Sequence, residues 1–287
     1  MLLRFIFFLF LKQSLLSEQY VTPVRALWVV RDHLTLKKSI DEVLFFANKN
    51  GFNHIFAQVR GRGDAYYNSK IVPKSHLVKP DFDPLDYLLE SNNNKNIKIH
   101  AWINIYYLWS SKTLPIQRNH LLFKEPEWID RNKHDSYIKE QIYLRNKNKL
   151  KIDGEGFYLA PTNPMVNRYL ISVVDELSRN YKIDGIHYDY IRFHNSNYGH
   201  NESGLSEFGR KSYNKYNSNE DINFSEFRRN SITKFVKEAS KNIKSNSSNI
   251  IISAAVKPNI YNAKLLFFQE WDLWLSAGYL DWAVPMN

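Results

Sequence analysis

The sequence predicts an α/β fold, namely a (β/α)8 barrel of the TIM type with about six barrel strands and an incomplete C-terminal side. Short apolar runs rich in β-branched and aromatic residues alternate with helical patterns from Val24 onward, as expected for parallel βα units. No G-x-G-x-x-G follows the first of these runs, which disfavours a dinucleotide-binding sheet. The 287 residues suit one barrel domain, because such barrels use roughly 250 residues.

Each element is justified by its local pattern. Expected strands, bounded by polar and turn residues, cover 24–30, 53–60, 97–104, 182–193, 249–256 and 279–285. Expected helices cover 36–50, 84–91, 163–181, 224–243 and 271–277. Gly51 ends the first helix, and Asn163-Pro164 starts the third. The stretch 106–158 lacks periodicity, which predicts an elaborated loop with a hairpin near 146–149. A short strand is expected at 157–160, and it could count as a further barrel strand. The polar stretch 194–222 predicts a long surface loop.

Composition excludes several functional classes. The chain has no cysteine, so it carries no disulfide, cysteine-liganded zinc or cysteine nucleophile. Its net charge is +10, yet no run of five basic residues occurs, which favours a scattered basic surface over a nucleic-acid partner. The nine histidines show no H-E-x-x-H spacing. We therefore expect no metal and no cofactor.

The N-terminus predicts export. Residues 2–11 are apolar apart from Arg4, which matches a signal-peptide core but is too short for a membrane-spanning helix of about 20 residues. We expect residues 1–17 to be a signal peptide and 20–287 to be a single domain, truncated at its C-terminus. The mature chain is then a periplasmic or extracellular monomer without stable membrane insertion.

Polar residues follow the expected strands at the barrel end where active sites lie. In Asp184–Asp189, the two-residue repeat of a strand places His187 and Asp189 on one face with Gly185. Asp189 is predicted to be a nucleophile or stabilising carboxylate, with a structural Asp–Arg pair as the alternative. The residues expected to bind substrate are Gln58, Arg60, Asn104, Tyr106, His187, Arg192, Lys257 and Asn287.

Several segments resemble the family-10-like glycoside hydrolases. These are VRALWVVRD from Val24, QVRGRGDAYY from Gln58, DGIHYDYIRF from Asp184 and DWAVPMN from Asp281. The resemblance implies an exported bacterial (α/β)8 barrel that acts on glycosidic bonds, in some members those of cell-wall glycans. DGIHYDYIRF is also similar to the fourth-strand motif of the α-amylase superfamily, which implies a nucleophilic role for Asp189.

Glycoside hydrolysis needs two carboxyl groups. Asp189 is the candidate nucleophile or base, and Asp64, Glu207 and Glu270 are the candidates for the acid. The chain is thus expected to be a glycosidase that cleaves a polysaccharide such as peptidoglycan by two-carboxylate chemistry. The alternative is a glycan-binding protein on a barrel that has lost catalysis.

Overall fold

A computed structural model describes residues 23–92, 96–133, 154–212 and 220–286. Six parallel strands form its main sheet in the order β1-β2-β3-β6-β7-β8. The strands are β1 (Ala26–Val29), β2 (His54–Arg60), β3 (Lys98–Asn104), β6 (Gly185–Asp189), β7 (Ile251–Val256) and β8 (Trp282–Pro285). All six expected barrel strands are therefore confirmed, within a few residues at their ends.

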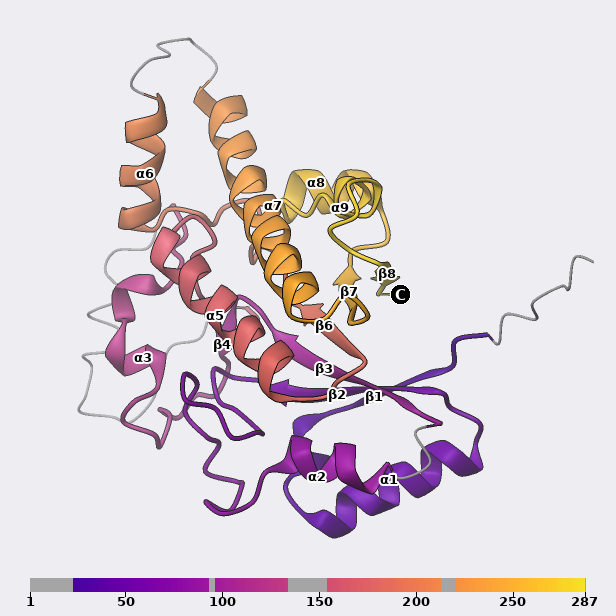
Figure 1. Ribbon diagram of the computed structural model, residues 1–287. Coiled ribbons are helices and arrows are strands. Elements are labelled where there is room, and N and C mark those ends of the chain that lie inside the picture. Colours follow the sequence, from indigo (N-terminus) through magenta and orange to yellow (C-terminus); the bar gives the residue numbers. More distant parts are fainter. Residues whose placement is uncertain (1–22, 93–95, 134–153, 213–219, 287) are drawn as a thin grey trace, which may run out of the picture.

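Helices connect the strands and lie around the outside of the curled sheet (Figure 1). The longer ones are α1 (Lys37–Lys49), α2 (Pro84–Ser91), α5 (Pro164–Asn180), α6 (Glu202–Ser212), α7 (Glu220–Asn246), α8 (Ile260–Leu266) and α9 (Trp271–Ser276). Short turns of helix are η1 (Arg31–Leu34), α3 (Leu121–Lys124) and η2 (Pro126–Trp128). Strands in chain order with helical crossovers between them make an incomplete (β/α)8 barrel.

The side chains of β6 point alternately to the two faces of the sheet, as the two-residue repeat of a strand predicts. The Tyr188 ring lies 6.1 Å from the ring of Phe235 on α7, so this face packs on the helices. His187 lies on the opposite face, 4.5 Å from the ring of Phe56 on β2. The carboxyl end of this inner face is where Asp189 is placed.

The segment 157–160 is not a barrel strand. Its strand, β5 (Phe157–Tyr158), pairs antiparallel with β4 (Tyr107–Trp109) in a separate two-stranded sheet. Only two residues separate β4 from the end of β3, so this small sheet lies next to the strand ends. The hairpin expected at 146–149 lies outside the described residues.

The prediction of a surface loop at 194–222 was wrong, because α6 and the start of α7 lie within this stretch. The side chain of Asn201 accepts hydrogen bonds from the backbone N–H groups of Ser203 and Gly204, at 3.1 and 3.3 Å, and so caps α6. Phe208 of α6 packs against Phe227 of α7, with 5.3 Å between ring centres. A short helix, α8, was also missed.

In the described part of the chain, no helix is long and apolar enough to span a membrane. The predicted signal peptide lies outside that part.

Candidate active site

Three predicted polar residues lie side by side, because β2, β3 and β6 are adjacent and parallel. Asn104 at the end of β3 is in register with Asp189 at the end of β6. Gln58 Nε2 of β2 lies 3.5 Å from Asn104 Oδ1, and Gln58 Oε1 accepts a hydrogen bond of 3.1 Å from Arg31. Asn104 Nδ2 donates to the Gly61 carbonyl at 2.9 Å. Gln58, Asn104 and Asp189 therefore form one polar edge at the carboxyl end of the sheet.

Asp189 is oriented by two donors. Trp102 Nε1 donates to Asp189 Oδ2 at 3.2 Å, and the backbone N–H of Tyr190 donates to Oδ1 at 2.7 Å. Burial raises the pKa of Asp189, and the negative charge of Glu155 adds to this effect. The Tyr190 N–H, the charge of Arg192 and the Trp102 N–H lower the pKa but do not cancel the rise. Asp189 therefore holds its proton to a higher pH than an ordinary aspartate does.

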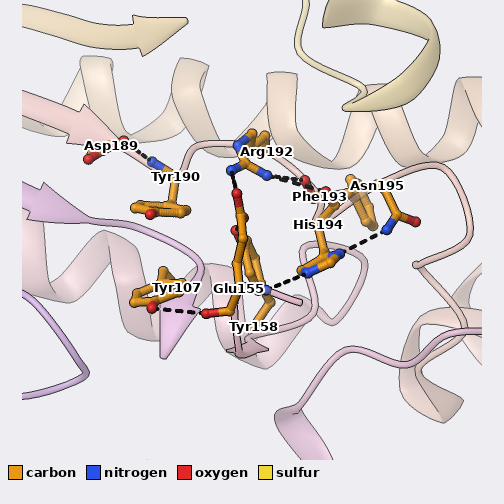
Figure 2. A network of polar contacts seen from close by, with 9 residues as sticks. All are labelled: Tyr107, Glu155, Tyr158, Asp189, Tyr190, Arg192, Phe193, His194 and Asn195. Atoms are coloured by element: carbon orange, nitrogen blue, oxygen red, sulfur yellow. Dashed lines mark hydrogen bonds and ion pairs between the residues drawn. The ribbon is translucent and has the colours of Figure 1, made fainter. Parts of the chain in front are cut away.

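Glu155 and Arg192 form an ion pair close to Asp189 (Figure 2). Arg192 Nη2 lies 3.1 Å from Glu155 Oε1 and 2.8 Å from Oε2, and the Tyr158 hydroxyl also donates to Oε2. Burial by itself would raise the pKa of Glu155, but the Tyr158 hydrogen bond and the Arg192 charge outweigh it and lower the pKa. The Glu155 side chain is 47% exposed and that of Arg192 is 5% exposed. The carboxylate is thus open to a ligand, and the guanidinium is not.

Backbone contacts fix this ion pair in place. Arg192 Nη1 donates to the carbonyl oxygens of Phe193 and His194, at 3.1 and 3.3 Å. The N–H of Glu155 donates to His194 Nε2 at 3.3 Å, and the Tyr107 hydroxyl donates to the Glu155 carbonyl at 3.0 Å. The segment that carries Glu155 is therefore attached both to the loop after β6 and to β4.

Tyr190 turns the chain sharply after Asp189. Its φ angle is 49°, in the left-handed region, which costs a residue other than glycine roughly 1–3 kcal/mol. Its ring stacks on that of Tyr107, with 4.4 Å between the ring centres. In Figure 2 the Tyr190 ring lies below Asp189, and the Tyr107 ring lies below that of Tyr190, next to Glu155. Aromatic faces next to carboxylates suit the apolar faces and hydroxyl groups of a sugar.

His187, expected to bind substrate, is fully buried inside the half-barrel. Its Nδ1 lies 2.9 Å from Ser253 Oγ on β7. Burial lowers the pKa of His187 to about 3, with a smaller contribution from His100, so the ring is neutral. The structure therefore places His187 in the buried interior below the strand end, where it contacts core residues.

Arg60 and Tyr106 connect the strand ends to the surrounding chain. Arg60 is buried, and its Nη1 donates to the backbone carbonyls of Asn104 and Ile105. The Tyr106 hydroxyl donates to Asn167 Oδ1 of α5 at 2.9 Å, and burial raises its pKa well above the ordinary value. Both side chains are therefore buried, and their hydrogen bonds go to the protein itself.

The remaining predicted residues are spread over other contacts. Asp64 Oδ1 accepts a hydrogen bond of 3.0 Å from the backbone N–H of Arg62 in its own turn. Lys257 Nζ lies 4.8 Å from the centre of the Phe267 ring. The last predicted substrate residue, Asn287, is outside the described residues.

Glu270 is engaged with α7. Its Oε1 lies 3.4 Å from Arg229 Nε, and its Oε2 accepts a hydrogen bond of 3.1 Å from Thr233 Oγ1. Both partners belong to α7, so this carboxylate is engaged within the helical layer.

Glu155 was missed from the sequence because the stretch 106–158 has no helical or strand periodicity. One local signal was available, since Glu155 stands between two glycines. Both glycines have positive φ, 53° for Gly154 and 126° for Gly156. A Cβ atom on Gly156 would lie 2.3 Å from the Trp109 carbonyl oxygen. Glycine is therefore required there to bring Glu155 against β4.

The polar groups around Asp189 and Glu155 are engaged with one another and with neighbouring N–H and O–H donors. Within the described ranges, no group of three histidine, aspartate or glutamate side chains is arranged to hold a metal. The carboxylates that do approach one another are already bound by donors, which are Arg192, Tyr158, Trp102 and a backbone N–H.

Comparison with known proteins identifies the family. Residues 21–286 match the family described as glycosyl hydrolase-like 10. The chain belongs to this family. Among the curated members of similar sequence, glycosyl hydrolase DigH of Escherichia coli (strain K12) is 28% identical over 205 residues, which are 68% of this chain and 42% of DigH. Glycosyl hydrolase YngK of Bacillus subtilis (strain 168) is 23% identical over 285 residues, 90% of this chain and 51% of YngK. This glycosyl hydrolase-like 10 chain thus spans about half the length of these relatives or less.

Solved structures similar to this glycosyl hydrolase-like 10 chain support the barrel. The PgaB (BpsB) glycoside hydrolase domain from Bordetella bronchiseptica superposes with a TM-score of 0.67 at 9% identity, covering 92% of this chain and 74% of that one. An alpha-galactosidase from Lactobacillus brevis gives a TM-score of 0.51 at 10% identity, covering 92% and 30%. At such low identity these matches show the fold, and the family match supports a function of the glycosidase type.

Proposed function

We propose that the protein is an exported glycoside hydrolase that cleaves O-glycosidic bonds of a polysaccharide, with Asp189 and Glu155 as its two carboxyl groups. One observation carries this proposal. Asp189 lies at the carboxyl end of β6, Glu155 is near enough for its charge to act on the Asp189 carboxyl, and the surroundings shift the pKa values of the two groups in opposite directions. Opposed shifts in neighbouring carboxyl groups are the arrangement that an acid and a base require.

The pKa directions favour a division of roles. Asp189, whose pKa is raised, donates its proton to the glycosidic oxygen, and the C–O bond breaks as the leaving sugar departs with a new hydroxyl group. Glu155, whose pKa is lowered, is ionised and faces the positive charge that develops at the anomeric carbon. It either attacks this carbon or takes a proton from the attacking water. Asp189 thereby takes the acid role instead of the nucleophile role expected from the sequence.

Two groups at this edge of the sheet are open to a sugar. The Glu155 carboxylate is 47% exposed, and the Tyr190 ring is partly exposed and is stacked on the buried ring of Tyr107. We propose a cell-wall glycan as the substrate, because the net charge of +10 suits an acidic polymer and the N-terminal pattern predicts export.

The test uses glycan strands of peptidoglycan from which the peptides have been removed. Asp189→Asn is expected to abolish the release of reducing ends, a loss of about a hundredfold or more, with circular dichroism and the unfolding midpoint unchanged. Glu155→Gln should reduce the rate as well, whereas Asp81→Asn, at an exposed site, should not. Unchanged turnover in Asp189→Asn would refute the assignment. Binding of the glycan without any product in the wild type would instead support a non-catalytic glycan-binding protein.

A further inference from the structure

A second cavity lies in the helical layer between α5, α6 and α7, where α6 and α7 diverge above α5 (Figure 1). Its volume is about 470 Å³, within the range of small-molecule sites. Neither Asp189 nor Glu155 lines it. The cavity is therefore a distinct place for a ligand, and the reaction proposed above does not use it.

Polar groups without partners line this cavity. Thr162 is 3% exposed, and its buried Oγ1 has no hydrogen-bond partner among the described residues. The side-chain amide of Asn230 on α7 makes no hydrogen bond within the described part of the chain. The Arg168 guanidinium on α5 contacts the Met165 sulfur at 2.7 Å and has no acidic partner in that part. The Thr162 hydroxyl is covered by Gly204 of α6, so the exposed Asn230 amide and the exposed Arg168 guanidinium are the two groups left to bond to a ligand.

The charges around the cavity cancel. Arg168 and Lys234 bring two positive charges, and Glu207 and Glu238 bring two negative ones. Lys234 Nζ lies 3.7 Å from Glu238 Oε1, so part of the charge is already paired. A site for a phosphate or a nucleic acid would carry an excess of positive charge. The balance favours a ligand without net charge.

The floor of the cavity is apolar. Phe227 and Phe235 of α7 line it and are both buried, while Asn167 is held by the Tyr106 hydroxyl and by its own bond of 2.9 Å to the Pro161 carbonyl. The rim residues Arg168, Asn230 and Lys234 are exposed. An aromatic floor under a polar, electrically balanced rim fits a ring with one C–H face and many hydroxyl groups.

We propose that this cavity is a second carbohydrate site that binds a neutral oligosaccharide outside the catalytic cleft. The choice of ligand rests on the proposed function, because a glycosidase meets its polymer over a larger surface than the cleft alone. Such a site would hold a glycan chain near the enzyme, so it would increase the rate of hydrolysis of polymers more than that of short substrates.

The test measures binding in an Asp189→Asn background, where turnover does not consume the ligand. Calorimetric titrations use chitotetraose, cellotetraose and maltotetraose as neutral probes. Asn230→Trp, which fills the cavity from the exposed face of α7, is expected to remove a binding event that remains in the matched control Lys241→Trp at another exposed position of α7. Asn230→Ala, a milder change, should weaken the same event about three- to tenfold by removing its hydrogen bonds.

The outcomes separate this inference from the proposed function. Binding that is equal in Asn230→Trp and Lys241→Trp, or no binding of any of the three probes, would overturn the second site and leave the catalytic proposal standing. Loss of binding in Asn230→Trp, together with full hydrolysis by a chain carrying Asp189→Asn, would overturn the catalytic proposal and keep the second site. With Asp189 intact, Asn230→Trp should lower hydrolysis of the polymer more than that of a short soluble substrate.

Discussion

Asp189 and Glu155 both respond to Arg192, whose positive charge lowers the pKa of each. Glu155 acts on Asp189 in the opposite direction and raises its pKa. The charges of Arg192 and Glu155 therefore both influence the pKa of Asp189, and they do so in opposite directions. This coupling follows from contacts between segments far apart in sequence, since Glu155 and Arg192 are 37 positions apart.

Two substitutions should move the acid–base behaviour of Asp189 in opposite directions. Arg192→Gln removes the positive charge and leaves Glu155 ionised, so the pKa of Asp189 should rise. Glu155→Gln removes a negative charge, so the pKa of Asp189 should fall. The measurement is the pH profile of kcat/KM, or a 13C NMR titration of the Asp189 carboxyl. Shifts in the same direction for both variants would contradict the coupling.

At the level of single elements, periodicity and caps predicted the repeating part of the fold. Helix α5 was predicted within about a residue at each end, because the Asn163 side chain caps it and Pro164 opens it. The strand repeat in Gly185–Asp189 predicted which face holds Asp189. Both signals are local, and neighbouring residues alone produce them.

Elements that depend on distant contacts escaped the prediction. Helix α6 contains Gly204 and Gly209 and few apolar residues, so its propensity is weak. It is held instead by the Asn201 cap and by the contacts of Phe208 with α7. The position of the Glu155 side chain depends on its ion pair with Arg192, which is 37 positions away in the sequence. A local sequence pattern does not indicate such a partner. Of the two carboxyl groups in the proposed site, Asp189 was among the candidates named from the sequence and Glu155 was not.

The two glycines of α6 should respond differently to alanine. A Cβ atom on Gly204 would lie 2.1 Å from Thr162 Oγ1, whereas a Cβ atom on Gly209 would meet nothing within 4 Å. Gly204→Ala should therefore destabilise the protein by about 1–3 kcal/mol through overpacking. Gly209→Ala should stabilise it by roughly 0.5–1 kcal/mol through helix propensity. Urea denaturation measures both values, and equal effects of the two variants would contradict the packing seen at α6.

On the scale of the whole molecule, the inner face of the half-barrel is lined with buried histidines. His54 Nδ1 lies 2.8 Å from His100 Nε2, and His187 lies on the neighbouring strand β6. Burial lowers the pKa of all three histidines, and for His100 and His187 it does so to about 3. The nearby His54 lowers the pKa of His100 further, and His100 does the same for His187. These groups bind fewer protons in the folded state than in the unfolded state. Stability should therefore fall as the pH falls from about 6.5 toward 3.

Asp130 opposes this trend. It is a buried carboxyl whose pKa burial raises to about 7, despite hydrogen bonds from the N–H groups of Arg131 and Gly199 and the nearby charge of Arg228. Between pH 4 and pH 7 it binds more protons when folded than when unfolded, so its contribution to stability increases as the pH falls. The observed pH dependence is the difference between the histidine effect and the Asp130 effect.

Asp130→Asn should therefore make the protein more sensitive to acid. The amide has no proton to gain, so the offsetting contribution disappears and the histidine contribution remains. The free energy of unfolding, measured in urea at pH 7.5 and at pH 5, should drop by more in Asp130→Asn than in the wild type. Asp81→Asn, at an exposed carboxyl, serves as the control and should keep the wild-type difference. An equal drop in all three proteins would mean that Asp130 does not take up a proton on folding.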